Sequence, residues 1–354
     1  MGNFESILSE HRVRIENRIT EYATDFELRM RTEYPTNSIE PDRAFIDMLQ
    51  RGGKRLRGIV AAMSYRHHGG DDESVELDLA LTVEMYHAYI LMADDIQDRS
   101  SKRRGKPTAH ELLRTHHEEN ELLRDSGHYG VSMAIDSFLT ASHEASNLII
   151  SMNIADEARV ALQRKINEIF ISTAHGQTLD IYNEVARQVQ VEDIDAVMKL
   201  KTAYYTFIGP LQYGAIAAGS DMEPALETVG LNAGYLFQVT DDILGVFGDD
   251  GATGKSNMDD IREGKQTVLV NHAMQHGSLE DAEYLFSRLG KDDLTQEEFL
   301  HCQTIVRSSG ALKAAQELVE QYADKVFTGL STMPESELLQ FLSQLVNYLR
   351  VRDK

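Results

Sequence analysis

Two aspartates one helical turn apart are the residues best suited to chemistry in this sequence. Asp94 and Asp98 end an apolar, helix-periodic stretch that starts near Leu77. On a helix their carboxylates stand about 6 Å apart on one face, where they repel each other unless a cation lies between them. Acidic residues at the end of a helix also oppose its dipole. Because hard oxygen ligands without cysteine favour Mg²⁺, which also shares phosphate oxygens, the pair predicts a magnesium site.

A second acidic helix is predicted further along the chain. Gln238, Asp241 and Gly245 follow i, i+3, i+7 spacing, which places an amide, a carboxylate and a position without a side chain on one face. If this helix faces the first, Asp94, Asp98 and Asp241 can hold several Mg²⁺ ions onto which a diphosphate binds. Metal and basic side chains would then neutralise a departing diphosphate together.

Basic residues gather on both sides of the first aspartate pair. The segment 51–58 carries four cations and no acid, and the segment 99–106 carries five cations and no acid. Either segment alone is as consistent with a solvated basic turn as with a binding site. His87, seven residues before Asp94, lies only about 20° from the same helical stripe, which favours a functional role for it.

Further polar residues are ordinary surface chemistry when taken singly. Taken together, they predict an anion-binding rim around the two carboxylate helices. Lys201 and Thr202 are expected to open a helix, and Gln177 and Asp180 lie one turn apart. The remaining members are Lys255 and Lys265.

The elements that must position these residues are helices. Apolar residues recur at intervals of three and four along most of the chain, whereas strand signals are scarce. An apolar face from Ile7 to Met30 predicts a first helix that Pro35 stops. We therefore expect one all-α domain over residues 1–354, with a motif-bearing core over about 50–270 and roughly a dozen helices. The predicted breaks are 69–72, 105–108, 126–127, 219–224, 248–254 and 277–278.

Composition excludes some partners. The 35 basic and 57 acidic residues give a net charge of −22, which argues against nucleic acid and against attraction to an anionic membrane. The most apolar stretch, 204–218, is interrupted by Gly209 and Pro210 and is shorter than the roughly 20 residues that span a bilayer, so stable membrane insertion is not expected. A single cysteine, Cys302, and a polar, acidic N-terminus favour the cytoplasm.

Seven motifs in order resemble a known family. GGKRLRG, DDIQDRSSKRRGKPT, GQTLD, KT, FQVTDDILGVFGD, TGK and DIREGKQT, spread over about 52–267, resemble the trans-isoprenyl diphosphate synthases, or polyprenyl synthetases. Within this family the chain resembles the short-chain geranylgeranyl and farnesyl diphosphate synthases. The resemblance implies an all-α, isoprenoid-synthase-like helical bundle around a central cavity, and a homodimer. It also implies a Mg²⁺-dependent prenyltransferase that condenses isopentenyl diphosphate head-to-tail with an allylic diphosphate.

The resemblance also implies roles for single residues. The pocket for isopentenyl diphosphate comprises Lys54, Arg57, His87 and Arg104. The allylic diphosphate is held by Arg103, Lys201, Thr202, Gln238, Lys255 and Lys265. The Mg²⁺ ligands are Asp94, Asp98 and Asp241, which count with Lys201 and Lys255 as catalytic. Supporting roles around them fall to Asp95, Gln177, Asp180 and Asp242.

Product length is a finer inference from the family. There, the residue five before the first aspartate plugs the pocket for the growing chain, and here it is Tyr89, with Ile90 beside it. Helical geometry alone places Ile90, not Tyr89, under Asp94. A single aromatic residue without the two-residue insertion of many bacterial members resembles synthases of the all-trans C20 geranylgeranyl product, with C15 farnesyl second.

Departures from the family pattern leave alternatives open. The third aspartate of the second motif is replaced by Gly245, which puts its metal geometry in doubt, and the stretch 110–128 has no mechanistic role. A class I terpene cyclase also uses an aspartate motif and Mg²⁺, but it would leave the basic acceptor pocket unexplained. A non-catalytic regulatory subunit of a prenyl synthase is a further alternative, although such subunits usually lose the first aspartate motif.

Overall fold

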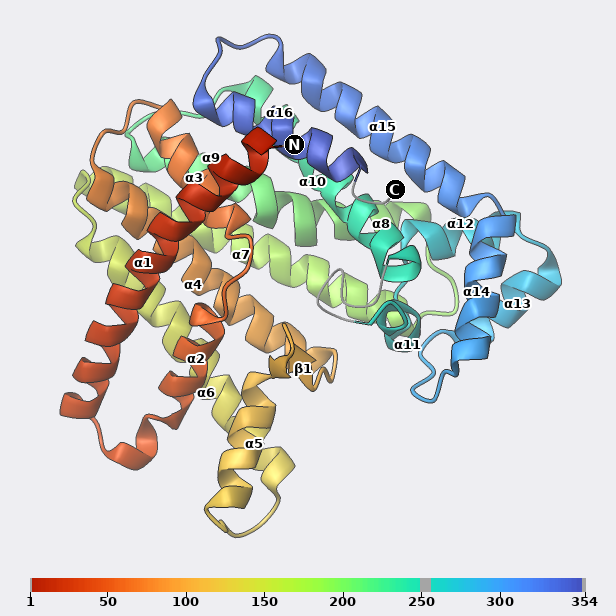
Figure 1. Cartoon of the computed structure of the whole chain (residues 1–354), viewed down its shortest axis with the longest axis horizontal. Coiled ribbons are helices and arrows are strands. Elements are labelled where there is room, and N and C mark those ends of the chain that lie inside the picture. Colours follow the sequence, from red (N-terminus) through yellow and green to blue (C-terminus); the bar gives the residue numbers. More distant parts are fainter. Residues whose placement is uncertain (1, 249–255, 352–354) are drawn as a thin grey trace. The chain divides into compact units, whose positions relative to one another are not determined.

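The computed structural model describes residues 2–248 and 256–351, and nearly all of its regular structure is helical (Figure 1). The chain groups into two compact units. The first unit comprises Gly2–Arg164 and Gln212–Asp221, and the second comprises Lys165–Leu211 and Met222–Lys354. The predicted all-α class is confirmed, and the single domain over residues 1–354 stays a prediction.

Helix α4 lies at the centre of the first unit, where it packs against α3, α6, α1 and α2. Apolar side chains such as Ile15, Ile19 and Phe26 on α1 are buried, so the predicted first helix and its stop before Pro35 are confirmed. The elements of this unit are α1 (Gly2–Glu33), η1 (Thr36–Ser38), α2 (Glu40–Gln50), α3 (Leu56–His67), α4 (Glu73–Gln97), β1 (Lys102–Arg103), β2 (Lys106–Pro107), α5 (Ala109–Glu119), α6 (Ser126–Ser151), the start of α7 (Asp156–Val185) and most of α9 (Gly209–Ala217).

Helix α4 carries the first acidic motif at its C-terminal end. Asp72 caps its N-terminus by accepting hydrogen bonds from the backbone N–H groups of Ser74 and Val75. At the other end Asp98 is the C-cap, and its backbone N–H donates to the carbonyl of Asp94 at 2.8 Å. The i, i+4 relation between the two aspartates therefore exists as the sequence predicted.

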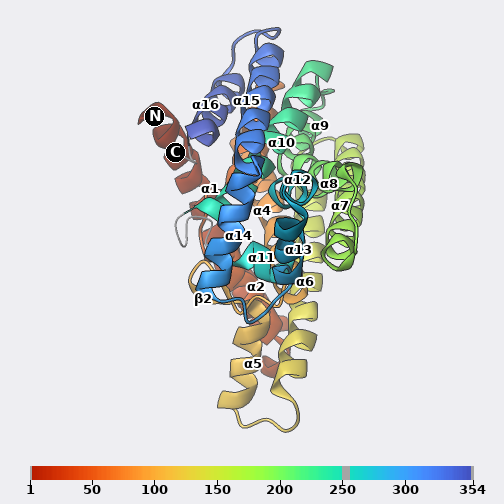
Figure 2. The same ribbon diagram turned by 90° about the vertical axis from the view of Figure 1, so that its right-hand side faces the viewer.

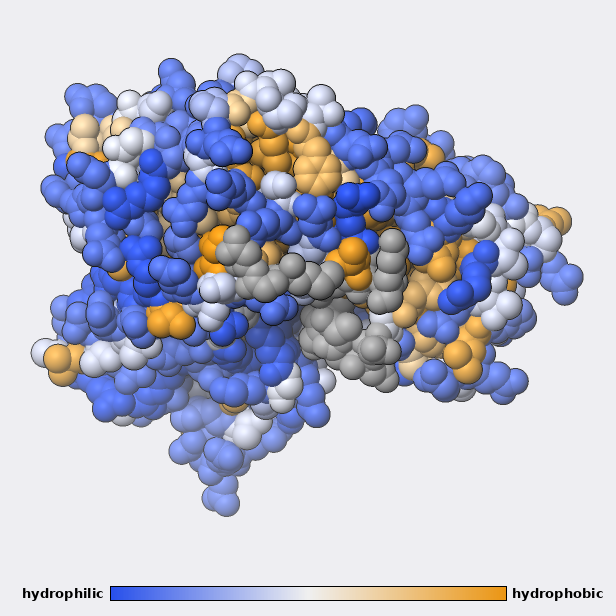
Figure 3. All heavy atoms as spheres, turned by 45° about the horizontal axis from the view of Figure 1, so that its top comes forward, coloured by the Kyte–Doolittle hydropathy of each residue, from blue (hydrophilic) through white to orange (hydrophobic). Residues whose placement is uncertain are grey.

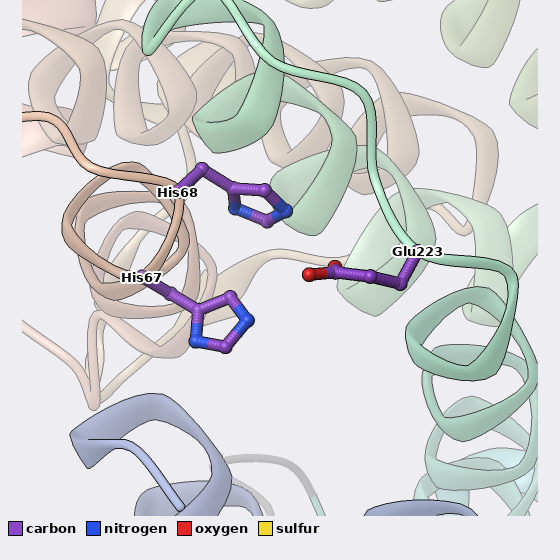
Figure 4. Close-up of side chains that lie close together, drawn as sticks. All are labelled: His67, His68 and Glu223. Carbon is purple, nitrogen blue, oxygen red and sulfur yellow. The ribbon is translucent and has the colours of Figure 1, made fainter. Parts of the chain in front are cut away.

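The rest of the first unit completes this frame. The strands β1 and β2, of two residues each, pair antiparallel in a hairpin that carries most of the second basic segment. Helices α5 and α6 run side by side as a hairpin, visible from two directions (Figures 1 and 2). The predicted break at 126–127 is wrong, because Asp125 caps α6 and the helix begins at Ser126. At the end of α3, the rings of His67 and His68 meet edge to face with centroids 5.0 Å apart (Figure 4).

Helix α10 has the central position in the second unit. It packs against η2, α15, α16 and α12, begins at Pro224 in the first helical turn and ends before Gly248. Because it is buried on most sides, its polar Gln238–Asp242 segment has to be satisfied within the protein. The elements here are the rest of α7, α8 (Val191–Val197), η2 (Met198–Ile208), α10 (Pro224–Phe247), α11 (Asp259–Glu263), α12 (Val268–His276), α13 (Leu279–Arg288), α14 (Gln296–Ser308), α15 (Ala311–Leu330) and α16 (Glu337–Val351).

The segment η2 is a π-helix, and two glycines fit closely against it. A Cβ atom on Gly176 of α7 would lie 2.6 Å from the backbone nitrogen of Lys201, and one on Gly234 of α10 would lie 2.4 Å from the Cα of Ala203. The expectation that Lys201 opens a helix is wrong, since α8 already starts at Val191 and continues into η2. Single-turn π-bulges often mark functional sites, but this π segment covers 11 residues.

On the face shown in Figure 3, hydrophilic residues cover most of the surface and hydrophobic ones form separate patches. Among the described residues, we find no helix whose length and apolar character would let it cross a membrane.

Candidate active site

In the first unit, Arg103 is held by the first two aspartates of the acidic motif. Its Nε donates to Asp95 Oδ1 at 2.6 Å and its Nη2 donates to Asp94 Oδ2 at 2.8 Å. Asp95 is fully buried, and Arg103 retains only 15% exposure of its side chain. Burial lowers the pKa of Arg103, but the two carboxylates outweigh it and leave that pKa above its ordinary value. The guanidinium is thus a fixed positive charge beside the predicted metal ligands.

Arg104, the next residue, contacts the other basic segment, 51–58. Its Nη1 donates to the carbonyl oxygen of Gly52. Gly53 has φ +124°, and a Cβ there would lie 2.7 Å from the Arg104 guanidinium, so only glycine fits this turn. Arg104 itself adopts the left-handed conformation with φ 55°. Gly52 and Gly53 of the first motif therefore form a turn against which the Arg104 side chain packs.

Arg51 makes a further connection between the two basic segments. Its guanidinium donates to the backbone carbonyls of Arg103 at 3.4 Å and Pro107 at 2.5 Å, while Asp47 accepts from it at 2.5 Å. These contacts attach the β1–β2 hairpin to the end of α2. The two segments that sequence alone left as separate basic turns therefore form one cluster.

His87 lies within this basic cluster. Burial is the main cause that lowers its pKa well below the ordinary histidine value, and the charges of Arg57, Arg104, Arg103 and Arg55 lower it further. The imidazole is consequently neutral at physiological pH, and it can donate one hydrogen bond without adding charge. An anion bound among these arginines would meet a neutral donor as well as cations.

Arg55 has a part in this cluster that sequence reasoning missed. It is only 5% exposed, its Nη1 donates to Glu84 Oε2 at 3.1 Å, and its Nη2 donates to the carbonyl of Leu49 at 2.7 Å. The other Glu84 oxygen accepts from the backbone N–H of Gly58 at 3.1 Å. This buried ion pair attaches the first motif to α4. The only signal in the sequence was an acid three residues before His87.

In the second unit, three hydrogen bonds orient the polar side chains around α10. Lys201 Nζ donates to Asp180 Oδ2 at 2.6 Å, which links η2 to α7. Thr202 Oγ1 donates to Gln238 Oε1 at 2.5 Å, and Gln238 Nε2 donates to Asp242 Oδ1 at 2.6 Å. The amide of Gln238 is thereby fixed in one orientation between a hydroxyl and a carboxylate.

A cluster of carboxylates surrounds the second acidic motif. Burial raises the pKa of Asp242 well above its usual value, and the negative charges of Asp260, Asp241 and Asp180 raise it further. The hydrogen bond from Gln238 acts in the opposite direction. Such a cluster is the all-oxygen donor set that suits Mg²⁺, so the residues present fit this metal.

The glycine that replaces the third aspartate lies directly under another carboxylate. A Cβ on Gly245 would lie 1.9 Å from Asp260 Oδ2, so the Asp260 side chain occupies the volume that an aspartate at position 245 would need. Nearby, Lys265 Nζ lies 2.7 Å from Glu263 Oε2, and the Lys265 backbone N–H donates to the Asp260 carbonyl. At the position where many family members have a third aspartate, the nearest carboxylate is therefore that of Asp260.

Of five other predicted site residues, four fall within the described residues. Lys255 lies outside the described residues. Lys54 is exposed beside the glycine turn, Gln177 is half-buried on α7, and Tyr89 and Ile90 are half-buried on α4 below the first acidic motif. In the first unit the structure brings together Arg57, His87, Asp94, Asp95, Arg103 and Arg104. In the second unit it brings together Asp180, Lys201, Thr202, Gln238, Asp241 and Asp242.

The comparison that decides the family is a match over residues 41–306 to the model of the polyprenyl synthetases. The chain belongs to this family. A geranylfarnesyl diphosphate synthase of Aeropyrum pernix is 32% identical over 329 residues, which cover 90% of this chain and 96% of that protein. A geranylgeranyl diphosphate synthase of Saccharolobus solfataricus is 30% identical, over 92% of this chain and 95% of that one.

Solved structures of other polyprenyl synthetases have the same fold. A geranylgeranyl pyrophosphate synthase of Corynebacterium glutamicum, complexed with isoprenyl diphosphate and magnesium, has a TM-score of 0.88 and 30% identity over 96% of this chain and 97% of its own. A polyprenyl synthase of Caulobacter crescentus, complexed with calcium and isoprenyl diphosphate, has a TM-score of 0.73 and 26% identity over 95% and 98%. The predicted family, fold class and enzyme class, a prenyltransferase, are confirmed.

Proposed function

We propose that this prenyltransferase condenses isopentenyl diphosphate head-to-tail with an allylic diphosphate, and that its main product is the C20 geranylgeranyl diphosphate, with C15 farnesyl second. Relatives with geranylgeranyl and geranylfarnesyl products support the short-chain class. The observation that carries the proposal is the basic cluster of Arg57, Arg103 and Arg104 around neutral His87. A terpene cyclase takes no isopentenyl diphosphate and has no need of this second anion site.

The acceptor, isopentenyl diphosphate, is assigned to the basic cluster with Lys54. Its diphosphate would receive charge-assisted hydrogen bonds from Arg57 and Arg104, and one neutral hydrogen bond from His87. The Arg55–Glu84 ion pair positions the turn of the first basic segment, so the charges of the other arginines stay available for the diphosphate. The turn at Gly53 keeps Arg104 directed toward the first motif.

The metal ligands are assigned to Asp94 and Asp98 in the first unit and Asp241 in the second. Several Mg²⁺ ions would neutralise the diphosphate that departs from the allylic substrate. Arg103, fixed against Asp94 and Asp95, adds a positive charge that needs no rearrangement during the reaction. Asp95, Asp242, Asp180 and Gln177 orient these groups.

The allylic diphosphate is also assigned to residues of the second unit. Lys201 is oriented by Asp180, and Thr202 and Gln238 are oriented by each other. Because donors that are already fixed lose little freedom on binding, they stabilise developing charge more than mobile ones. The remaining residues assigned to this substrate are Lys255 and Lys265.

The proposed reaction has three steps. The bond between the allylic carbon and the diphosphate oxygen breaks, and the positive side chains stabilise the departing oxygen. The acceptor alkene then attacks the allylic cation and forms the new carbon–carbon bond, in surroundings that exclude water. A proton leaves the carbon next to the new bond, and the departed diphosphate accepts it. No side chain of the protein is required as a general base.

A homodimer is part of the proposal, supported by exposed apolar stripes. On α6 the stripe follows spacings of 4 and 11 residues, and on α7 it follows a spacing of 11, so each lies on one helical face. The stripes consist of Ile135, Leu139 and Ile150 on α6, and of Val160, Ile171 and Tyr182 on α7. Sedimentation of the purified chain at several concentrations tests this state.

Cytoplasmic localisation is likewise proposed, supported by one free, buried cysteine.

One assay separates the candidate functions. The purified protein is mixed with isopentenyl diphosphate, geranyl or farnesyl diphosphate as primer, and MgCl₂, and the products are dephosphorylated and sized. An elongated prenyl alcohol that requires isopentenyl diphosphate supports the proposal. A hydrocarbon formed from the primer alone would identify a cyclase. No product, with an active partner synthase stimulated on addition of this chain, would identify a regulatory subunit.

A further inference from the structure

Tyr89 of α4 and Phe138 of α6 form an aromatic pair in the first unit. Their ring centroids are 5.6 Å apart and their planes meet at 60°, an edge-to-face arrangement that aromatic rings prefer. The two helices pack against each other in antiparallel directions, since Tyr86 contacts Ser146 and Tyr89 contacts Phe138. Phe138 therefore comes from a different helix than every residue so far assigned to product length.

Neither ring of this pair is fully buried. Tyr89 and Phe138 both keep exposed surface, as do Ile90 and Leu139 beside them, whereas Ala88 is 3% exposed and Met92 and Ala141 are 0% exposed. A core phenylalanine at a helix contact is ordinarily enclosed like these last three residues. The two rings therefore border space that solvent reaches, on the side of α4 below the first acidic motif.

One turn further from Asp94, the contact between the helices is closed by hydrogen bonds. Tyr86 is 5% exposed, its hydroxyl lies 3.0 Å from Ser146 Oγ, and Gln163 Nε2 lies 3.5 Å from the same hydroxyl. At the helical rise, Tyr86 lies about 4.5 Å below Tyr89 along α4. This separation is similar to the length of one isoprene unit of a prenyl chain. A chain that passed the aromatic pair would meet this polar layer after one more unit.

We propose that Phe138 is a specificity-determining residue, which closes the elongation pocket jointly with Tyr89. The inference rests on the proposed function, in which Tyr89 ends the pocket for the growing chain. Because each ring lies against the other, removal of Tyr89 alone leaves the Phe138 ring across part of the opening. Removal of Phe138 frees Tyr89 to rotate aside and leaves apolar space that suits a further prenyl unit.

The experiment compares the product length of Phe138→Ala with that of the wild-type protein, using isopentenyl diphosphate, farnesyl diphosphate and Mg²⁺. The main product is expected to lengthen by one C5 unit, and the double variant with Tyr89→Ser is expected to give a longer product than either single variant. Phe286→Ala on α13, where the ring is 45% exposed, is the matched control and is expected to leave product length unchanged.

The outcomes separate this inference from the function on which it rests. If Tyr89→Ser lengthens the product and Phe138→Ala does not, the role of Phe138 is wrong. If neither variant changes the distribution, the assignment of Tyr89 in the proposed function fails with it. Should Phe138→Ala fold poorly, as its melting temperature would show, Phe138→Leu keeps an apolar side chain that is smaller than the ring and should still open part of the pocket. An unchanged product from that folded variant would also overturn the inference.

Discussion

At Arg103, the negative charges of the first acidic motif lie next to the positive charges of the basic cluster. Arg103 contacts Asp94 and Asp95 directly, and a neighbouring residue, Arg104, is held by the glycine turn of the other basic segment. An exposed ion pair would contribute little, but this one is largely buried, so each partner depends on the other for its orientation. Substitution of Asp94 would thus disturb a proposed metal ligand and also the arginine that is proposed to bind the allylic diphosphate.

Asp94→Ala is expected to lower turnover by about 10³-fold, because the proposed ligand is lost and several kcal/mol of charge stabilisation go with it. Product formation at saturating substrates measures the loss, and circular dichroism checks that the helices remain. Asp71→Ala, at an exposed site before α4, is the control and should keep wild-type turnover. A near-native rate for Asp94→Ala would contradict the metal assignment.

Asp42, at the start of α2, offers a test of stability against pH. Burial is the main cause that raises its pKa to about 6, and the nearby Glu144 carboxylate raises it further. Since the folded state favours the neutral form, this residue contributes stability at low pH that is lost as pH rises from about 4 to about 6. Because Asp42 is half-exposed, the loss above pH 6 is about 1 kcal/mol rather than the full shift.

Asp42→Asn removes this ionisation, so we expect the variant to gain stability relative to wild type, by more at pH 8 than at pH 5. Urea unfolding at both pH values measures the difference. Asp25→Asn, exposed on α1, should show no such pH dependence. An advantage of Asp42→Asn that is equal at both pH values would show that the carboxyl is not the source.

At the scale of elements, the π-helix η2 depends on close contacts with its neighbours. Gly176 on α7 and Gly234 on α10 leave no room for a side chain against its backbone at Lys201 and Ala203. Since Lys201 and Thr202 project from this segment, any shift of η2 moves two residues assigned to the allylic diphosphate. The packing of three helices therefore sets the position of these side chains.

Gly176→Ala is expected to displace η2, with a cost of about 1–3 kcal/mol in unfolding free energy and a higher KM for the allylic diphosphate. Steady-state kinetics with varied primer and a thermal melt measure both effects. Gly127→Ala on α6, where the new Cβ would have only an ordinary contact at 3.5 Å, is the matched control. Equal kinetics for the two variants would show that η2 tolerates the shift.

The same elements show what a sequence can predict. The periodicity and spacing around Asp94 and Gln238 depend on neighbours within one helix, so α4, α10 and the i, i+4 aspartates were predictable. The Arg55–Glu84 pair and the placement of Asp260 over Gly245 were not, because the partners lie 29 residues apart in one case and on different helices in the other. Residue spacing also carries no signal for a π-helix, which forms here where two glycines let neighbouring helices approach.

For the whole molecule, a net charge of −22 is at odds with two anionic substrates. The structure resolves the local part of this conflict in the first unit, where the arginines gather around His87 and Asp94. In the second unit the carboxylates Asp180, Asp241 and Asp242 gather with Asp260. Without a divalent cation, this second cluster would repel the diphosphate that Lys201 and Gln238 are assigned to hold.

Removal of metal should therefore abolish binding of the allylic substrate as well as turnover. With EDTA, we expect the affinity for an unreactive allylic diphosphate analogue to fall by about 100-fold or more, since several kcal/mol of attraction become repulsion. Isothermal calorimetry with and without MgCl₂ measures this change. Isopentenyl diphosphate, assigned to the arginine cluster, should lose much less affinity under the same conditions. An equal loss for both ligands would contradict the separation into a metal-dependent and an arginine-dependent site.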